Sequence, residues 1–187
     1  QDINDEHRAV RTTAGVFDVS GLKKIHIVGP DAVVVADHVM TRDMTQIGVG
    51  RSVYALVLTD DGGFTDDCIM FHLAPNHIMM VHGSGTAMEQ LQKSAVGKNV
   101  DIRFDDDLQG PKSVDILRQH TPIDIDALKY FHQTPTTLFG HSCIISRTGF
   151  SGERGFEIFS KASDVGGIWD GILEHGKVHG VIPGSFN

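Results

Sequence analysis

The stretch LVLTDDGGFTDDCIMF, residues 56–71, consists of two apolar segments joined by a tight turn. The Asp-Gly-Gly sequence at positions 61–63 tolerates the positive φ angles of a hairpin turn, and the flanking segments have the composition of strands. Asp66 and Asp67 stand at the start of the second strand, directly before an apolar run. Because side chains alternate along a strand, the two carboxylates point to opposite faces, and at least one of them points toward an interior.

Two interpretations of this aspartate pair are open at this point. Aspartates beside turns commonly accept hydrogen bonds from backbone N–H groups or face water, and the local chemistry favours that interpretation. The alternative is a carboxylate held at the rim of a pocket, where it orients or stabilises a cationic substrate. The rest of the chain has to decide between them.

The composition predicts a globular protein that acts on a small molecule. The chain has 187 residues, of which 40% are hydrophobic, enough for a real core. The net charge is −8, and the longest cationic run is the pair Lys23 and Lys24, which argues against nucleic acid or an anionic membrane as a partner. No apolar run reaches the length of a membrane span, and residues 1–4 lack the features of a signal peptide, so we expect a cytoplasmic protein. The oligomeric state is not indicated.

The cysteines and histidines do not predict a metal site. Cys68 and Cys143 lie in apolar, strand-like surroundings without Cys-x-x-Cys spacing, which favours reduced, buried thiols. Of the eleven histidines, His72, His77 and His82 fall in or beside one hairpin, where alternation places them on different faces.

The order of the expected elements predicts an α+β fold. Asp31 is expected to cap the second helix, and residues 22–28 alternate as a half-exposed strand. The order β-α-β-β-α is found twice, which predicts two intertwined units, residues 1–105 and 106–187, whose helices cover mixed or antiparallel sheets. We expect helices at residues 5–13, 32–40, 86–95, 114–119 and 164–175. We expect strands at 14–20, 22–28, 52–59, 78–81, 100–104 and 156–159 and one centred on residues 143–145 within 136–146, besides the second strand of the opening hairpin. The strand at 100–104 is expected to open the second repeat.

Two further stretches are candidates for ligand contacts. His-Gly-Ser-Gly-Thr at 82–86 lies between a strand and a helix, as phosphate-binding turns do, but Met88 stands where a dinucleotide fingerprint needs glycine, so a structural turn is favoured. In Arg-Thr-Gly-Phe-Ser-Gly-Glu-Arg-Gly-Phe-Glu at 147–157, Glu157 interrupts an apolar strand. It is either exposed on the polar face or an acceptor for a flat ligand with paired N–H donors, and the pattern alone favours exposure.

Four motifs in order resemble the glycine-cleavage T-protein family, which comprises tetrahydrofolate-dependent aminomethyltransferases and related demethylases. They are GVFDVS at 15–20, DGGFTDD at 61–67, LQGPK at 108–112, and SRTGFSGE at 146–153 followed by GFE at 155–157. The resemblance covers nearly the whole chain. It implies the folate-binding fold of that family, with a C-terminal barrel domain expected to follow this chain.

The resemblance also implies roles for individual residues. Asp67 matches the family's catalytic aspartate beside the folate nitrogen that receives the one-carbon unit. Glu157 matches the glutamate that binds the amino and ring N–H groups of the pterin, and Tyr54 matches a tyrosine of the folate pocket. A carboxylate near the reacting nitrogen stabilises developing positive charge, and a second one accepts paired N–H donors.

Three further positions of the implied folate pocket depart from the aminomethyltransferase pattern. Phe71 and Phe150 stand where those enzymes usually have tyrosines, and His82 stands where they have an asparagine that contacts the ligand. The change in hydrogen-bonding groups favours a demethylase of a small methylated amine, sulfonium or aryl ether over the glycine-cleavage reaction. The alternative is a non-catalytic folate-binding protein that resembles the iron–sulfur assembly factor of the same fold.

Overall fold

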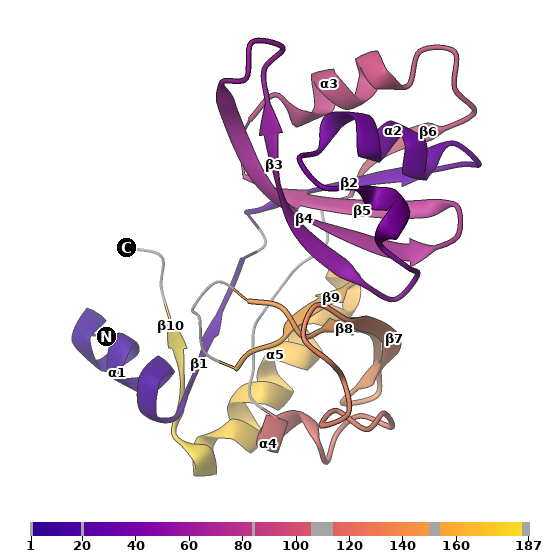
Figure 1. The fold of residues 1–187 in the computed structure, drawn as a ribbon. Coiled ribbons are helices and arrows are strands. Elements are labelled where there is room, and N and C mark those ends of the chain that lie inside the picture. Colours follow the sequence, from indigo (N-terminus) through magenta and orange to yellow (C-terminus); the bar gives the residue numbers. More distant parts are fainter. Residues whose placement is uncertain (1, 20, 84, 106–113, 150–153, 185–187) are drawn as a thin grey trace. The chain divides into compact units, whose positions relative to one another are not determined.

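The computed structural model describes residues 2–19, 21–83, 85–105, 114–149 and 154–184, which fold into two units (Figure 1). One unit is Gly21–Asp106, and the other combines Gln1–Ser20 with Asp107–Asn187. The expected boundary at residue 105 lies one residue from the observed end of the unit of residues 21–106. The expected first unit of residues 1–105 is wrong for its first 20 residues, because these belong to the other unit. The reason is a parallel pairing between β1 (Ala14–Phe17) and β10 (Val181–Gly184), which no local pattern reveals.

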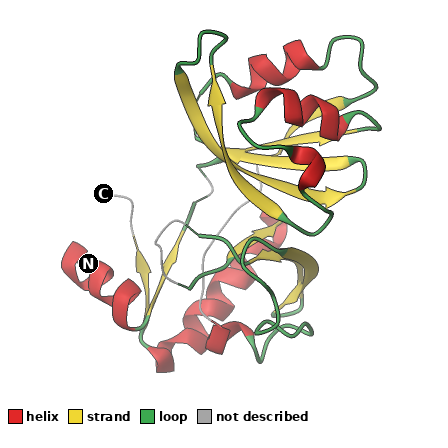
Figure 2. Ribbon diagram, in the orientation of Figure 1, coloured by secondary structure: helices red, strands yellow, loops and turns green. Residues whose placement is uncertain are grey.

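The unit of residues 21–106 contains a five-stranded antiparallel sheet in the order β3-β4-β5-β2-β6, with helices on one face (Figures 1 and 2). Its elements are β2 (Lys23–Val28), α2 (Ala32–Val39), the short 3₁₀ helix η1 (Met44–Gln46), β3 (Ser52–Leu58), β4 (Phe64–Ala74), β5 (His77–His82), α3 (Ala87–Ser94) and β6 (Asp101–Asp105). The strand expected over residues 22–28 forms as β2, in which Ile25 and Ile27 are buried and His26 is half-buried, as the alternation predicts. Lys24 departs from the pattern, because it retains only 1% of its exposed surface.

The hairpin of β3 and β4 forms as the opening stretch predicts. Cα pairs run from Ser52 with Phe71 to Leu56 with Asp67, and the register shifts between Val57 and Leu58. At the turn, the Thr59 N–H donates to the carbonyl of Gly63 at 2.8 Å, and Gly62 takes a φ of 86°, which glycine adopts without steric cost. The hairpin thus places Asp66 and Asp67 two and three residues beyond the start of β4.

The core of this unit lies between the sheet and the helices α2 and α3. Both helices turn small or branched apolar residues inward, because these recur at helical spacing. The expected cap of α2 is wrong: Asp31 makes no side-chain cap bond, and its Oδ2 instead accepts the N–H of Asn99 at 2.7 Å. The fully or nearly buried members are Ile25, Ile27, Ala32, Val35, Ala36, Val39, Met44, Ala55, Val57, Cys68, Met70, Ile78, Met80, Ala87 and Leu91.

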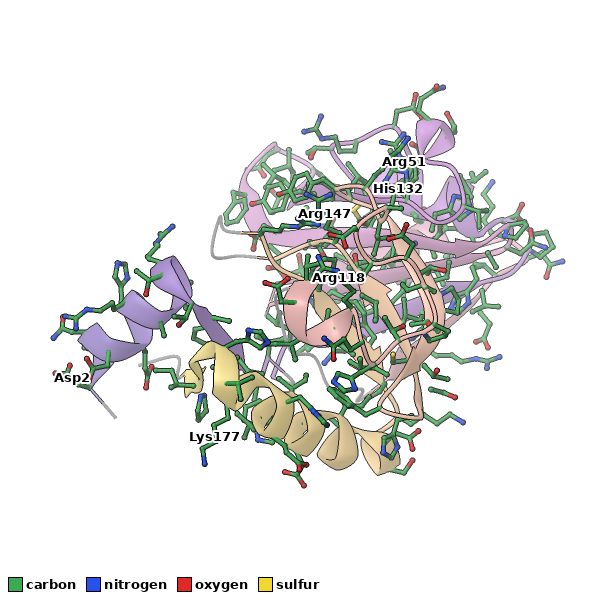
Figure 3. All side chains as sticks on the ribbon, turned by 90° about the horizontal axis from the view of Figure 1, so that it is seen from below. Asp2, Arg51, Arg118, His132, Arg147 and Lys177 are labelled. Carbon is green, nitrogen blue, oxygen red and sulfur yellow. The ribbon has the colours of Figure 1, made fainter. Side chains whose placement is uncertain are left out.

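The other unit combines a helix-rich region with two small sheets. Its elements are α1 (Ile3–Thr12), β1, α4 (Val114–Leu117), β7 (Gln133–Leu138), β8 (His141–Ser146), β9 (Glu157–Ser160), α5 (Ala162–Gly176), the 3₁₀ helix η2 (Lys177–His179) and β10. Strands β7, β8 and β9 form an antiparallel sheet in that order. Asp2 caps α1 by accepting the N–H of Asn4 at 2.9 Å, and Figure 3 labels Asp2 at this end of the helix.

The strand expected to be centred on residues 143–145 forms as β8, and Phe139 and Gly140, with φ angles of 50° and 83°, turn the chain between β7 and β8. The expected second β-α-β-β-α repeat is wrong at its start, because β6 pairs with β2 and so belongs to the five-stranded sheet. The fold class is nevertheless α+β with antiparallel sheets, as expected, and the buried residues of this unit include Val16, Leu138, Ile145, Phe156, Ile158, Ile168 and Ile172.

Candidate functional site

Tyr54 and Asp67 form a hydrogen-bonded pair on the five-stranded sheet. Tyr54 comes from β3 and Asp67 from β4, and the Tyr54 hydroxyl donates to Asp67 Oδ2 at 2.9 Å. Both side chains are exposed, so the carboxylate is open to a ligand while its orientation is fixed. The hydrogen bond to Asp67 raises the pKa of Tyr54, and the negative charge of Asp67 acts in the same direction. The phenol therefore stays a neutral donor.

The adjacent Asp66 has a different environment. It retains 7% of its exposed surface and lies on the opposite face of β4, as alternation predicts. Its Oδ2 accepts the N–H of Gly85 at 2.7 Å and contacts His82 Nδ1 at 2.8 Å, and its Oδ1 accepts the N–H of Asp67 at 2.9 Å. Burial alone would raise the pKa of Asp66, but the bonds from His82 and Gly85 outweigh it and hold that pKa below its usual value. The structural interpretation of the pair thus holds for Asp66.

His82 is a buried side chain at the end of β5. It was predicted as a ligand contact, and the structure places its Nδ1 on Asp66 while its Nε2 is buried without a hydrogen-bond partner among the described residues. The turn that follows is a structural one in the part described, because the Gly85 N–H donates to Asp66. A Cβ on Gly85 would lie 2.6 Å from the carbonyl oxygen of Thr65, which explains the glycine.

Of the two phenylalanines predicted for the pocket, the structure describes one. Phe71 lies on β4 opposite Ser52 and Met79 of the neighbouring strands, and its side chain has no exposed surface. Phe150 lies outside the described residues. A ligand contact by either ring stays a prediction.

Glu157 is buried, and the expectation from the residue pattern that it is exposed is wrong. It retains 6% of its exposed surface on β9, across from Ser146 of β8. The Thr148 hydroxyl contacts Glu157 Oε2 and lies 3.0 Å from Ser146 Oγ. Since that hydroxyl has one hydrogen, it serves the carboxylate, which is the stronger acceptor, and Ser146 then donates to Thr148. Burial raises the pKa of Glu157, although the bond from Thr148 opposes the effect.

The candidate residues fall into two groups. Tyr54, Asp67, Phe71 and His82 belong to the unit of residues 21–106, whereas Glu157 belongs to the other unit. Sequence reasoning missed the roles of Asp66 and Thr148, which are set by cross-strand and turn contacts. Thr148 lies two residues beyond Ser146, which pairs with Glu157 across the strands. The sequence does not reveal the pairing of Ser146 with Glu157, so it could not place Thr148 beside the glutamate.

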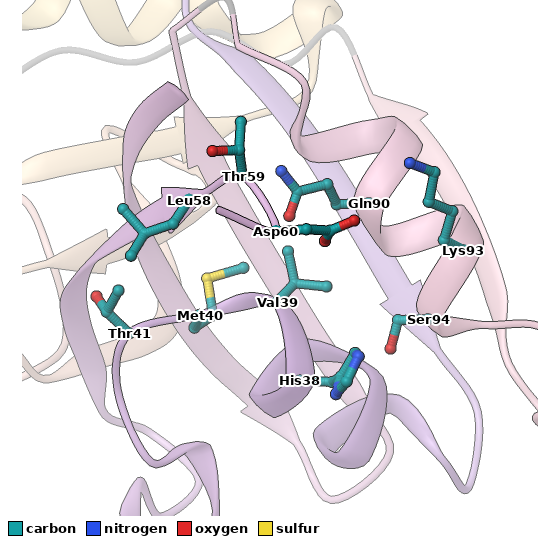
Figure 4. Close-up of a pocket in the computed structure, with 10 residues that line it drawn as sticks. All are labelled: His38, Val39, Met40, Thr41, Leu58, Thr59, Asp60, Gln90, Lys93 and Ser94. Carbon is teal, nitrogen blue, oxygen red and sulfur yellow. The ribbon is translucent and has the colours of Figure 1, made fainter. Parts of the chain in front are cut away.

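A pocket of about 400 Å³ lies at a different place, between the C-terminal end of α2, the end of the β3–β4 hairpin and α3 (Figure 4). Val39, Met40 and Leu58 give it apolar walls, and Asp60 and Lys93 contribute opposite charges. None of the predicted site residues lines this pocket. No motif of the sequence indicated it, because its walls come from three separate elements.

Cys68 and Cys143 are buried, and the pKa of each thiol is raised. Burial, with the negative charges of Asp66 and Asp67, raises the pKa of Cys68 to about 12, and burial raises that of Cys143 to about 11. Both are free cysteines. Within the described ranges, no three His, Cys, Asp or Glu side chains lie together in a way that could hold a metal ion. In the same part of the chain, each helix is too short or too polar to cross a bilayer.

The fold and these residues define a class of protein: an α+β domain with an antiparallel sheet, on which a tyrosine orients an exposed aspartate, and with a buried glutamate on a second small sheet. The chain belongs to the family described as the GCVT N-terminal domain, whose model matches residues 1–186. This confirms the resemblance to the glycine-cleavage T-protein family.

The relatives of this chain include enzymes and an enzyme subunit. The chain is 52% identical over 190 residues to the heme-dependent oxidative N-demethylase gamma subunit of Ectopseudomonas mendocina, with 99% of this chain and 50% of that protein covered. It is 35% identical over 188 residues to an aminomethyltransferase of Streptomyces avermitilis, with 96% and 50% covered. The chain thus spans about half the length of these curated relatives.

Solved structures show the same fold. The glycine cleavage system aminomethyltransferase T from Bartonella henselae superposes with a TM-score of 0.84 at 24% identity, covering 97% of this chain and 50% of that one. A chain of the heterotetrameric sarcosine oxidase from Corynebacterium sp. U-96 superposes with a TM-score of 0.65 at 15% identity, covering 99% of each. At these identities the two structures show the fold alone.

Proposed function

We propose that this chain is the folate-binding part of a tetrahydrofolate-dependent one-carbon transferase whose donor is a small N-methylated amine. The observation that carries the proposal is the Tyr54–Asp67 pair, an oriented and exposed carboxylate at the position where the family has its catalytic aspartate. Among the donors that the sequence favours, an amine is supported by the N-demethylase subunit to which the chain is 52% identical.

The buried acceptor Glu157 supports tetrahydrofolate as the ligand. Its carboxyl accepts from the Thr148 hydroxyl, and burial nevertheless raises its pKa. Two N–H donors from a flat heterocycle would stabilise the ionised carboxylate through charge-assisted hydrogen bonds. When bound, tetrahydrofolate supplies the nucleophilic nitrogen that carries the one-carbon unit.

Asp67 is proposed to act by charge and position. An exposed carboxylate next to a reacting amine stabilises positive charge that develops as the carbon is transferred. The Tyr54 hydroxyl keeps one carboxylate oxygen in place, so that little reorientation is needed during the reaction. Because the relatives are named as transferases and an N-demethylase subunit, we favour this function over a non-catalytic folate-binding protein.

The test is a calorimetric titration of tetrahydrofolate into the 187-residue chain, with Glu157→Ala as the control. We expect saturable binding that the substitution abolishes or weakens by more than about tenfold. Asp67→Asn should keep that affinity and lower the rate of transfer from an N-methylated amine by about 100-fold or more, measured as labelled folate product. Absence of binding by the unsubstituted chain would overturn the proposal, and equal losses of affinity and rate in Asp67→Asn would make Asp67 a binding residue instead.

A further inference from the structure

The pocket of about 400 Å³ in Figure 4 has no part in the proposed function. Its walls come from the C-terminal end of α2, the end of the β3–β4 hairpin and α3, and none of the described residues assigned to the folate pocket lines it. All three elements belong to the unit of residues 21–106, so that unit alone forms these walls. Pockets that bind small molecules start at about 300 Å³, so this one has room for a small ligand.

The inner wall of the pocket is apolar. Val39 retains 8% of its exposed surface, and Met40 and Leu58 are half-buried. The backbone of Met40 forms an isolated β-bridge with Val57, and its sulfur lies 3.6 Å from Cys68 Sγ. These contacts fix the wall in the core of the unit. An aliphatic group that enters the pocket removes apolar surface from water on both sides of the contact, which favours its binding.

Two opposite charges stand at the rim of the pocket. Asp60 follows β3, Lys93 lies in the last turn of α3, and both side chains are exposed. Within the described residues, neither side chain forms an ion pair, with the other or with a third group. Figure 4 shows the Asp60 carboxylate pointing toward α3, the helix that carries Lys93. Both charges are therefore available to a ligand in the pocket.

The end of α2 reinforces the negative side of the pocket. This helix ends at Val39, and its cap residue Met40 takes extended backbone angles, with a φ of −101° and a ψ of 155°, and makes no capping backbone hydrogen bond. The last carbonyl groups of a helix carry partial negative charge. Asp60 and this helix end together favour a cationic group, whereas Lys93 favours an anionic group on the side of α3.

We propose that this pocket binds a small zwitterion with an aliphatic side chain, an aliphatic α-amino acid. Its ammonium group lies at Asp60 and its carboxylate at Lys93, while its side chain packs against the apolar wall. An α-amino acid carries both charges on one carbon atom, so it can bridge two side chains that do not reach each other. Exposed charges contribute little each, so the affinity is in the millimolar range. The inference does not depend on the proposed function.

The test is a titration of the 187-residue chain with L-leucine at neutral pH, followed by NMR of methionine labelled with ¹³C in its methyl group. The Met40 signal is assigned by its loss in Met40→Leu. Three matched compounds each lack one part of leucine: isocaproate has no ammonium group, isoamylamine has no carboxylate, and glycine has no side chain. Met79 is the internal reference, because it pairs with Phe71 on β4 and does not line the pocket.

A saturable shift of the Met40 signal with leucine, at lower concentration than with any of the three matched compounds, supports the inference. If isocaproate or isoamylamine binds as tightly as leucine, the ligand is not recognised as a zwitterion and the inference is wrong. It is also overturned if the Met40 signal does not move, or if only Met79 moves, since leucine then binds elsewhere or not at all.

Two charge-neutralising variants test the assigned contacts. Asp60→Asn and Lys93→Gln should each weaken leucine binding by about threefold to fivefold, the size expected for one exposed charge pair. Lys98→Gln removes an exposed lysine that does not line the pocket and should leave leucine binding unchanged. Undiminished leucine binding by Asp60→Asn or Lys93→Gln refutes the assigned contact. The calorimetric titration with tetrahydrofolate should be the same for all three variants, which keeps this inference separate from the proposed function.

Discussion

Replacing Glu157 with glutamine should stabilise the protein and weaken its proposed ligand binding at the same time. Glu157 is 6% exposed, and burial raises its pKa despite the bond from Thr148. A carboxyl whose pKa is higher in the folded than in the unfolded chain binds more protons when folded, so stability falls as pH rises from the ordinary value of 4.5 through the folded pKa. Each unit of such a shift corresponds to about 1.4 kcal/mol. Glutamine has no charge to desolvate and still offers Thr148 a carbonyl acceptor.

We therefore expect Glu157→Gln to raise the free energy of unfolding by about 1–2 kcal/mol near pH 7 and to change it little near pH 4. Urea unfolding of both proteins at several pH values between these limits measures the difference, and the unsubstituted chain should lose stability relative to the variant as pH rises. Tetrahydrofolate affinity should fall by about tenfold or more, because the charge-assisted bonds are lost. Equal stabilities at every pH would refute the claim that Glu157 is buried with an uncompensated charge.

Three other substitutions or treatments test separate parts of the structure. Phe71→Ala should lower the free energy of unfolding by about 3–5 kcal/mol in urea, since the ring has no exposed surface; a loss below about 1 kcal/mol would mean that the ring is not part of the packed interior. Gly85→Ala should lower the free energy of unfolding by about 1–3 kcal/mol, because its Cβ would lie 2.6 Å from the Thr65 carbonyl oxygen. Gly83→Ala is the milder control in the same urea measurement, because the atom nearest to its Cβ would be 3.4 Å away. Burial raises the pKa of Cys68 to about 12 and that of Cys143 to about 11, so both thiols should resist Ellman's reagent near pH 8 in the native protein. Both should react at once in denaturant. Rapid labelling of either thiol in the native protein would contradict their burial.

The sequence predicts the elements of this fold better than their partners. The hairpin of residues 56–71 follows from its Asp-Gly-Gly turn and its strand composition, both of which are local. The pairing of β1 with β10 joins segments from the two ends of the described chain, and β6 joins a sheet that the repeat pattern did not assign to it. Such pairings depend on packing across long sequence separations, which neither periodicity nor composition records.

The same limit explains which site residues could be predicted. Asp67 and Glu157 attract notice because each places a charge within an apolar segment, and the family motifs then give them roles. Their environments are set by other residues. The residue pattern of β9 is compatible with an exposed glutamate, and only Thr148, beyond the partner strand, shows that the carboxyl points inward. His82 likewise could be predicted as a ligand contact, but the sequence does not show that its Nδ1 lies 2.8 Å from Asp66 Oδ2.

Asp66 and Asp67 are adjacent aspartates of β4 with different roles, because they lie on opposite faces of the sheet. Alternation sends Asp66 to the face of the sheet that the helices cover, where the N–H groups of Gly85 and Asp67 and the ring of His82 stabilise its charge. It sends Asp67 to the other face, where its exposed side chain lies beside Tyr54. A carboxylate with that many donors is a poor ligand for anything else, because its lone pairs are occupied. Asp67, with one hydroxyl donor and an exposed surface, keeps lone pairs for a substrate. The pair therefore provides both an anchor for the turn and β5 and an oriented charge for the reaction, and exchanging the two environments would require a one-residue shift in the register of β4.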